Sequence, residues 1–339
     1  MRNAPYLVPW VREREDVHRF ENILFVCDEH SAYELALERV IWLAALNQAR
    51  VTMVSTIDSG GSNDVSRLFS MIPGLGNSEI GETVIAVHRM KLEDRAQALR
   101  NHGIAVETKL LIGTPFIEII RQVLRDGHDI VIKGAHRAAG RRFLPGADMH
   151  LLRKCPCPIW VLNAASEPQA KRILVAVAPD PTDPNRDSLN RMIMELATSL
   201  ARNDGAKLDV MNVWRLQEEA TLRHGLANIP EEDIDRLVAK AQDDSKSRLQ
   251  DLVAGFSDYD DIMRVLHIKG VAGDVIPEHV TAESIDTIVM GTLTRTGVAG
   301  LFIGDTAETI LNHVSCSVLT AKAPGFVTPI GAGPAGGLH

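Results

Sequence analysis

The sequence predicts an α/β protein made of two tandem copies of one unit, each a doubly wound sheet of five parallel strands. Two observations lead to this prediction. Gly134 and Gly291 lie 157 positions apart, and Gly113 and Gly270 have the same separation, so two junctions recur at a single offset. Within each copy, short apolar runs alternate with segments whose apolar residues recur at helical spacing, as in a sheet covered by helices on both faces.

The first copy opens with the apolar run 22–27, which suits a strand buried on both faces of a parallel sheet. Its third strand ends at Gly113. Thr114 and Pro115 then predict the start of a helix, because threonine caps helices and proline is tolerated in their first turn. The other strands predicted for this copy are 51–54, 130–133 and 159–162.

The second copy repeats this order, with strands at 171–177, 208–211, 287–290 and 318–321 and a third strand that ends at Gly270. About seven additional residues separate its first two strands, and the segment 179–184, rich in proline and aspartate, is the expected place for them. The helix that follows is predicted from one apolar stripe: Leu189, Met192, Ile193, Leu196 and Leu200.

The length of 339 residues fits two domains of ordinary size. We expect a first domain at 18–164, a second at 170–324 and a flexible, glycine-rich tail at 325–339. The net charge of −8 argues against a general nucleic-acid or anionic-membrane binder, and no apolar run is long enough to span a bilayer. With four cysteines in no disulfide-like framework and no signal-peptide core, a cytoplasmic location is expected.

The loop after the fourth strand of the second copy carries the predicted chemistry. Ligands of open parallel sheets bind beyond the carboxyl ends of the strands, where this loop lies. It begins with Gly291-Thr292-Leu-Thr294, continues for nine residues and ends in Gly304-Asp305-Thr306. The glycines allow close approach to the backbone, and the following helix offers free N–H groups to an anion.

This loop resembles the nucleotide-binding pattern of the universal stress proteins, in which Gly-x-x-Gly is followed by nine residues and Gly-Ser/Thr. The first half, with the segments 128–133 and 148–156, is most similar to the tandem, E-type branch. The resemblance covers both halves. It implies a Rossmann-like fold of the adenine nucleotide alpha hydrolase type and a pseudo-two-fold pair of domains that meet through their fifth strands.

Family members that bind ATP place its phosphates on this loop and its adenine at the ends of the first two strands. Gly291 and Gly304 match the pattern, Thr294 replaces the second glycine, and Asp305 replaces the Ser/Thr, with Thr306 next to it as a substitute hydroxyl. The resemblance implies a cofactor site, for ATP, at eight positions of the second copy: Ala178, Val213, Gly291, Thr292, Thr294, Gly304, Asp305 and Thr306.

The first copy departs further from the pattern. It keeps an aspartate after the first strand, Asp28, where the second copy has Ala178, but Arg137 stands at the second glycine position. A metal site is an alternative there, with His136, Asp148 and His150 as candidate ligands. The basic residues around this loop offer a further alternative, an anion site: Arg137, Arg141, Arg142, Arg153 and Lys154.

No nucleophile, base and orienting group form a recognisable triad, so no catalytic residue is predicted. The resemblance implies a cytoplasmic stress-response protein that senses a nucleotide or another small ligand and acts through protein partners, with further homodimerisation in keeping with the family. The alternatives are a protein that binds a different ligand or a metal in its first domain, and a weak ATP hydrolase.

Overall fold

The computed structural model describes residues 20–28, 32–58, 77–135, 146–164, 166–225, 229–292 and 304–331. The first half contains β1 (Asn22–Val26), α1 (Tyr33–Asn47), β2 (Arg50–Ile57), α3 (Asn77–Arg100), β3 (Val106–Ile112), α4 (Pro115–Asp126), β4 (Ile130–Gly134), α5 (Gly146–Lys154) and β5 (Ile159–Leu162). The second half contains β6 (Arg172–Ala176), α6 (Pro184–Asp204), β7 (Lys207–Trp214), α7 (Glu219–His224), α8 (Glu231–Ala254), β8 (Met263–Lys269), α9 (Ala272–Ala282), β9 (Thr287–Gly291), α10 (Asp305–His313) and β10 (Ser317–Ala321).

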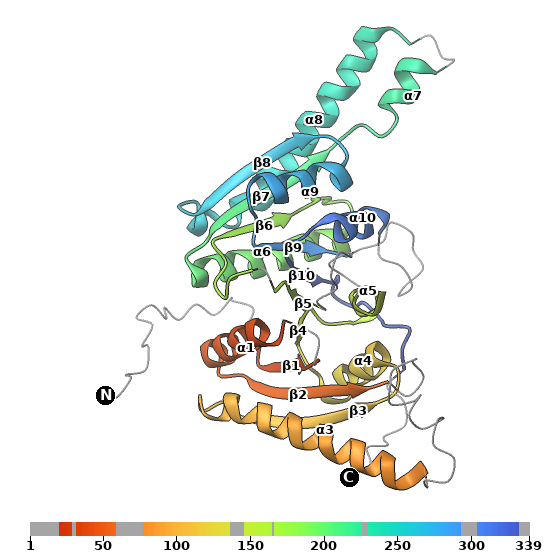
Figure 1. The fold of residues 1–339 in the computed structure, drawn as a ribbon. Coiled ribbons are helices and arrows are strands. Elements are labelled where there is room, and N and C mark those ends of the chain that lie inside the picture. Colours follow the sequence, from red (N-terminus) through yellow and green to blue (C-terminus); the bar gives the residue numbers. More distant parts are fainter. Residues whose placement is uncertain are drawn as a thin grey trace.

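The strands form one continuous sheet in the order β3-β2-β1-β4-β5-β10-β9-β6-β7-β8 (Figure 1). Strands within each half are parallel, whereas β5 and β10 pair antiparallel, with Trp160 opposite Leu319. The predicted α/β fold is confirmed, as is the predicted contact between the two fifth strands. The antiparallel pair turns two five-stranded sheets into one, because each half presents the same edge to the other.

Local signals in the sequence place the helix boundaries. The segment that lengthens the second half contains Asp183, whose carboxylate accepts hydrogen bonds from the backbone N–H groups of Asn185 and Arg186 and so caps α6. Pro184 occupies the first turn, where no intrahelical N–H bond is lost. The same helix ends at Gly205, which has a left-handed φ of 68°.

Two apolar cores cover the two faces of the sheet, and each runs through both halves. One is formed with helices α1, α3, α6 and α8, and the other with α4, α5, α9 and α10 (Figure 1). Trp160 and Leu319 of the central strands belong to the first core, and Val161 and Val318 belong to the second. The junction between the halves is therefore part of the hydrophobic interior.

A buried ion pair also joins the two halves. Arg39 of α1 donates from Nη1 and Nη2 to the two carboxylate oxygens of Asp204, the last residue of α6, at 2.9 and 2.5 Å. The side chains of this pair are 3% and 0% exposed, and the backbone N–H of Ala170 also donates to Asp204. The Arg39 guanidinium lies over the rings of Trp42 and Trp160 at 5.0 and 4.7 Å, so two aromatic rings add to the carboxylate as partners of its positive charge.

Across the described ranges, none of the helices combines the length and the apolar composition that crossing a membrane requires.

Candidate functional site

The candidate site of the second half lies at the carboxyl edge of its strands. β9 pairs with β6, and β6 pairs with β7, so Ala178, Val213 and Gly291 reach the same edge. Gly291 closes this edge tightly: a Cβ atom placed on it would lie 2.5 Å from Cδ2 of Leu189, the side chain of α6 that packs above it. Glycine is needed here for close packing of α6 against β9.

The N-terminus of α10 offers backbone N–H groups to an anion. Gly304 precedes the helix with extended backbone, and no side chain of the described residues caps it, although Gly304 O accepts the first helical hydrogen bond from Glu308 N. The unpaired N–H groups of the first turn point toward the carboxyl edge, since α10 returns the chain from β9 to the parallel strand β10. Asp305 and Thr306 are both exposed at this end.

A network of polar side chains occupies the place where the family pattern has an aspartate. The side chain of Asn190 accepts a hydrogen bond from Ala178 N at 2.9 Å and donates one to Ala178 O at 3.1 Å. Asn212 donates to Val177 O and accepts from Ser245 Oγ, both at 2.9 Å. Both asparagines were missed in the sequence. Asn190 could have been noticed, because it is a polar residue next to the apolar stripe of α6 and therefore a candidate for a buried hydrogen bond.

Thr292 faces the junction between the halves. It is buried, its N–H donates to Ala321 O at 3.1 Å, and its Oγ1 accepts a hydrogen bond from the ammonium of Lys322. The threonine therefore anchors the start of the loop to β10. Thr294, the other threonine of the predicted site, lies outside the described residues.

The first half carries a buried charged triad at the corresponding positions. Lys133 Nζ donates to Asp148 Oδ1 at 2.5 Å and to Asp28 Oδ2 at 3.3 Å. Lys133 and Asp148 have 5% and 1% of their side chains exposed. Burial alone would lower the pKa of Lys133, but the charges of Asp148 and Asp28 outweigh it and hold that pKa above its usual value.

The second half has no charge at these three positions, where Ala178, Met290 and Ala307 stand. The copies have therefore diverged at the floor of the site, with an ion-paired lysine in one and apolar side chains in the other. Gly134, the counterpart of Gly291, is packed against backbone rather than a side chain, since a Cβ on it would lie 2.6 Å from the nitrogen and 2.7 Å from the carbonyl carbon of Ala32.

The comparisons with known proteins agree with this architecture. A sequence model of the universal stress protein family matches residues 19–163 and again 169–322. The chain belongs to the universal stress protein family. Universal stress protein E of Escherichia coli (strain K12) is 26% identical over 316 residues, which make up 92% of this chain and 96% of the relative. The universal stress protein E homolog of Haemophilus influenzae is 25% identical over 310 residues, or 90% of this chain and 98% of the relative.

Solved structures show the same fold over nearly the whole chain. A structure from Pseudomonas aeruginosa UCBPP-PA14 superimposes with a TM-score of 0.65 and 23% identity, covering 90% of this chain and 94% of its own. A universal stress protein from Archaeoglobus fulgidus gives a TM-score of 0.60 and 17% identity, covering 89% and 98%. This universal stress protein is thus a tandem of two such domains, and it is similar over most of its length to several E-type proteins.

The candidate metal ligands of the first half have other partners. Asp148 pairs with Lys133, while the ring of His150 stacks on Phe116 with 4.8 Å between centroids. Burial lowers the pKa of His150, and the charges of Lys154 and Arg153 lower it further. His136 lies outside the described residues, and those residues hold no group of three His, Cys, Asp or Glu side chains suited to a metal.

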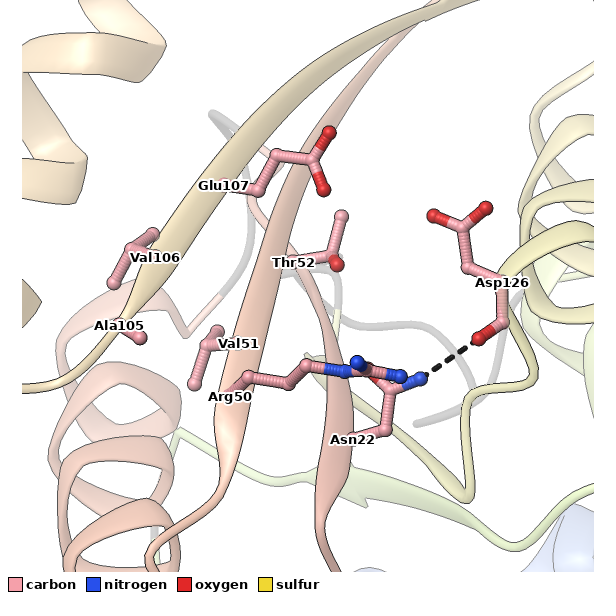
Figure 2. Close-up of a pocket in the computed structure, with 8 residues that line it drawn as sticks. All are labelled: Asn22, Arg50, Val51, Thr52, Ala105, Val106, Glu107 and Asp126. Carbon is pink, nitrogen blue, oxygen red and sulfur yellow. Dashed lines mark hydrogen bonds between the residues drawn. The ribbon is translucent and has the colours of Figure 1, made fainter.

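The opposite, amino edge of the first-half sheet holds a hollow that sequence reasoning also missed. It has a volume of about 400 Å³, and Figure 2 shows the Arg50 side chain reaching across it toward Asn22, below Thr52 and Glu107. Its lining residues are Asn22, Arg50, Val51, Thr52, Ala105, Val106, Glu107 and Asp126.

The second half fills this place with charged side chains. Asp209 stands where the first half has Thr52, and it is 1% exposed. It accepts hydrogen bonds from Arg264 at 2.9 and 2.6 Å and from His279 Nε2 at 2.9 Å. At the positions of Arg264 and His279 the first half has Glu107 and Gln122, so this group of ion pairs is not repeated beside the hollow.

Proposed function

We propose that this universal stress protein is a non-enzymatic, ligand-sensing stress-response protein whose second half binds an adenine nucleotide such as ATP. The observation that supports the proposal best is the uncapped N-terminus of α10 behind Gly304, at the same sheet edge as Gly291. Unpaired N–H groups and the helix dipole favour negative charge at that point. Phosphate oxygens are the groups of a nucleotide that fit there.

The apolar floor of the second half suits the remainder of such a ligand. Val213 is half-buried at the end of β7, and Ala178 is held by Asn190 without presenting a charge. Exposed Thr306 is available as a hydroxyl donor to a phosphate, whereas exposed Asp305 opposes a dense negative charge. This balance favours a nucleotide bound with moderate affinity, or one accompanied by a cation that offsets Asp305.

The first half is proposed not to bind a nucleotide in the same way. The Lys133 ammonium is already satisfied by two carboxylates, and the net charge of that triad is negative. Placing a phosphate beside Asp28 and Asp148 would be repulsive. One nucleotide per chain is therefore expected.

Sensing without catalysis is proposed because two ionisable groups near the second-half site, Glu308 and His267, already have structural partners. Glu308 pairs with Arg153, and His267 Nε2 lies 3.1 Å from Ser245 Oγ, deep in the asparagine network. The proposal includes a cytoplasmic location, which is supported because Cys27, Cys155, Cys157 and Cys316 form no disulfide.

Nucleotide binding is tested by native mass spectrometry and isothermal titration calorimetry with ATP. Wild-type protein should take up one ATP, and Gly304→Trp should take up none, because the indole covers the open helix end. Gly146→Trp is the matched control: it alters the start of α5 in the first half, where a Cβ would have free space. Unchanged ATP binding by Gly304→Trp would reject the proposed site.

A further inference from the structure

Lys322 joins the two candidate sites from a buried position. It follows β10 and is 7% exposed. Its ammonium donates to Leu152 O at 2.5 Å, in the last turns of α5, and to Thr292 Oγ1, next to Gly291. One side chain thus connects the start of the second-half loop to the helix that follows the first-half loop.

No anion balances this ammonium among the described residues. Its two acceptors, Leu152 O and Thr292 Oγ1, are neutral, and the ring of Phe326 lies 5.3 Å from Nζ. The loop sequences 136–145 and 293–303 contain four arginines and neither aspartate nor glutamate. Burial lowers the pKa of Lys322 to about 7, because the charged form loses its hydration without gaining a carboxylate.

The ionisable groups on the neighbouring elements do not supply the missing charge. Directly after α5, Cys155 is the ionisable group that acts on Lys322, and its effect is to raise the pKa of the lysine. Within α5, four residues before Leu152, Asp148 is committed to Lys133. From α10, Glu308 faces Arg153 of α5 and pairs with it.

We propose that Lys322 is the internal counter-charge for an anionic ligand held between Gly291 and Gly304, so that binding of the ligand draws a proton onto this lysine. The inference rests on the proposed nucleotide site in the second half. Through Leu152 O, the protonated lysine also ties the occupied loop to α5, so the first half responds to the same event.

The size of the effect follows from electrostatics. If the ligand acts as one net negative charge at an assumed separation of about 10 Å from the ammonium, in a medium of effective dielectric constant about 20, it should raise the proton affinity of Lys322 roughly tenfold to thirtyfold. Ligand affinity must then fall as pH rises, since the lysine is charged less often at high pH. Between pH 7.5 and 9 the expected loss of affinity is about fivefold.

Calorimetry of ATP binding in buffers of different ionisation enthalpy measures the proton directly. At pH 8.0, where the terminal phosphate of ATP is ionised, wild-type protein should take up more than about half a proton per ATP. Lys322→Met keeps the chain length without the charge, and Lys322→Arg keeps a permanent charge; neither should take up a proton or lose affinity between pH 7.5 and 9. Lys207→Met, which changes an exposed lysine at the amino end of β7, should behave as wild type.

The outcomes separate the inference from the proposed function. ATP binding without proton uptake in the wild type, or uptake that persists in Lys322→Met, would overturn the role of Lys322 and leave the nucleotide site standing. Absence of ATP binding at every pH would reject both. Proton uptake that disappears in Lys322→Met but persists in Lys207→Met would establish the inference.

Discussion

Replacing Arg39 with methionine is expected to destabilise the protein by about 3–5 kcal/mol, the usual cost of leaving one member of a buried ion pair without its partner. The reason lies in Asp204, whose side chain is fully buried between the halves. Without the guanidinium, the N–H of Ala170 is the one donor to its carboxylate that would remain among the described residues. Methionine fills much of the same volume, so the loss measures charge rather than a cavity.

A second contribution comes from the aromatic rings that flank the guanidinium. Trp42 and Trp160 lie within 5.0 Å of it, and a desolvated cation–π contact contributes about 1–2 kcal/mol. Asp204→Leu alone should cost a similar amount to Arg39→Met, because it leaves the arginine buried and unpaired. The double variant Arg39→Met/Asp204→Leu should recover most of the loss, since an apolar pair of similar volume replaces a buried ion pair at little cost.

Urea unfolding, followed by tryptophan fluorescence and by circular dichroism, measures these differences. The double-mutant cycle should give a coupling energy of at least about 2 kcal/mol. Arg191→Met is the control, because Arg191 makes an exposed pair with Asp187 one turn away in α6, and the change should stay within about 0.5 kcal/mol. Single variants within about 1 kcal/mol of wild type, or a coupling energy near zero, would refute the argument.

Three further outcomes follow from the described contacts. Gly134→Ala should lower the melting temperature more than Gly291→Ala, because the new methyl group meets backbone in the first case and a flexible leucine side chain in the second; the reverse order would count against the packing argument. Lys133→Met should cost about 3–5 kcal/mol in urea unfolding and Lys133→Met/Asp148→Leu much less, whereas equal losses would show that the triad is not coupled. Asp209→Asn should remove part of the acid sensitivity of folding. Burial alone would raise the pKa of Asp209, but hydrogen bonds from Arg264 and His279 lower it, so the carboxylate stabilises the fold above about pH 4 and loses this effect as pH falls through the folded pKa. An acid-unfolding curve that does not change in the variant would contradict this.

The fold could be predicted from the sequence because its signals are local and repeated. Strands are indicated by continuous apolar runs such as 22–27, and the ends of helix α4 are indicated by Pro115 and Gly127. Neither signal depends on contacts between distant parts of the chain. Because two junctions recur at the same offset, the order of strands and helices in one copy predicted the order in the other. The merging of the two sheets through β5 and β10 followed from the family resemblance, since neither strand is distinctive by itself.

The interior of the site could be predicted less well, because it depends on contacts between residues far apart in the chain. Lys133 reads as a polar residue at a strand end, and only the fold brings it to Asp28 and Asp148, which lie 105 and 15 positions away. Thr292 was predicted at the ligand, but its hydroxyl turns to Lys322 at the junction. A motif gives the backbone positions of a site, whereas the direction of each side chain is set by what packs against it.

The pair of Arg39 and Asp204 has no symmetry mate. The equivalent positions of the other copy are Leu196 and Asn47, which carry no charge, so this buried ion pair joins the halves on one side of the axis only. Two identical chains meeting in this way would have to bury the pair twice or not at all. Fusion into one polypeptide lifts that restriction: each half can evolve its own side of the seam and its own ligand chemistry, as a heterodimer does, while the joining segment keeps the partners at a fixed ratio and a high local concentration.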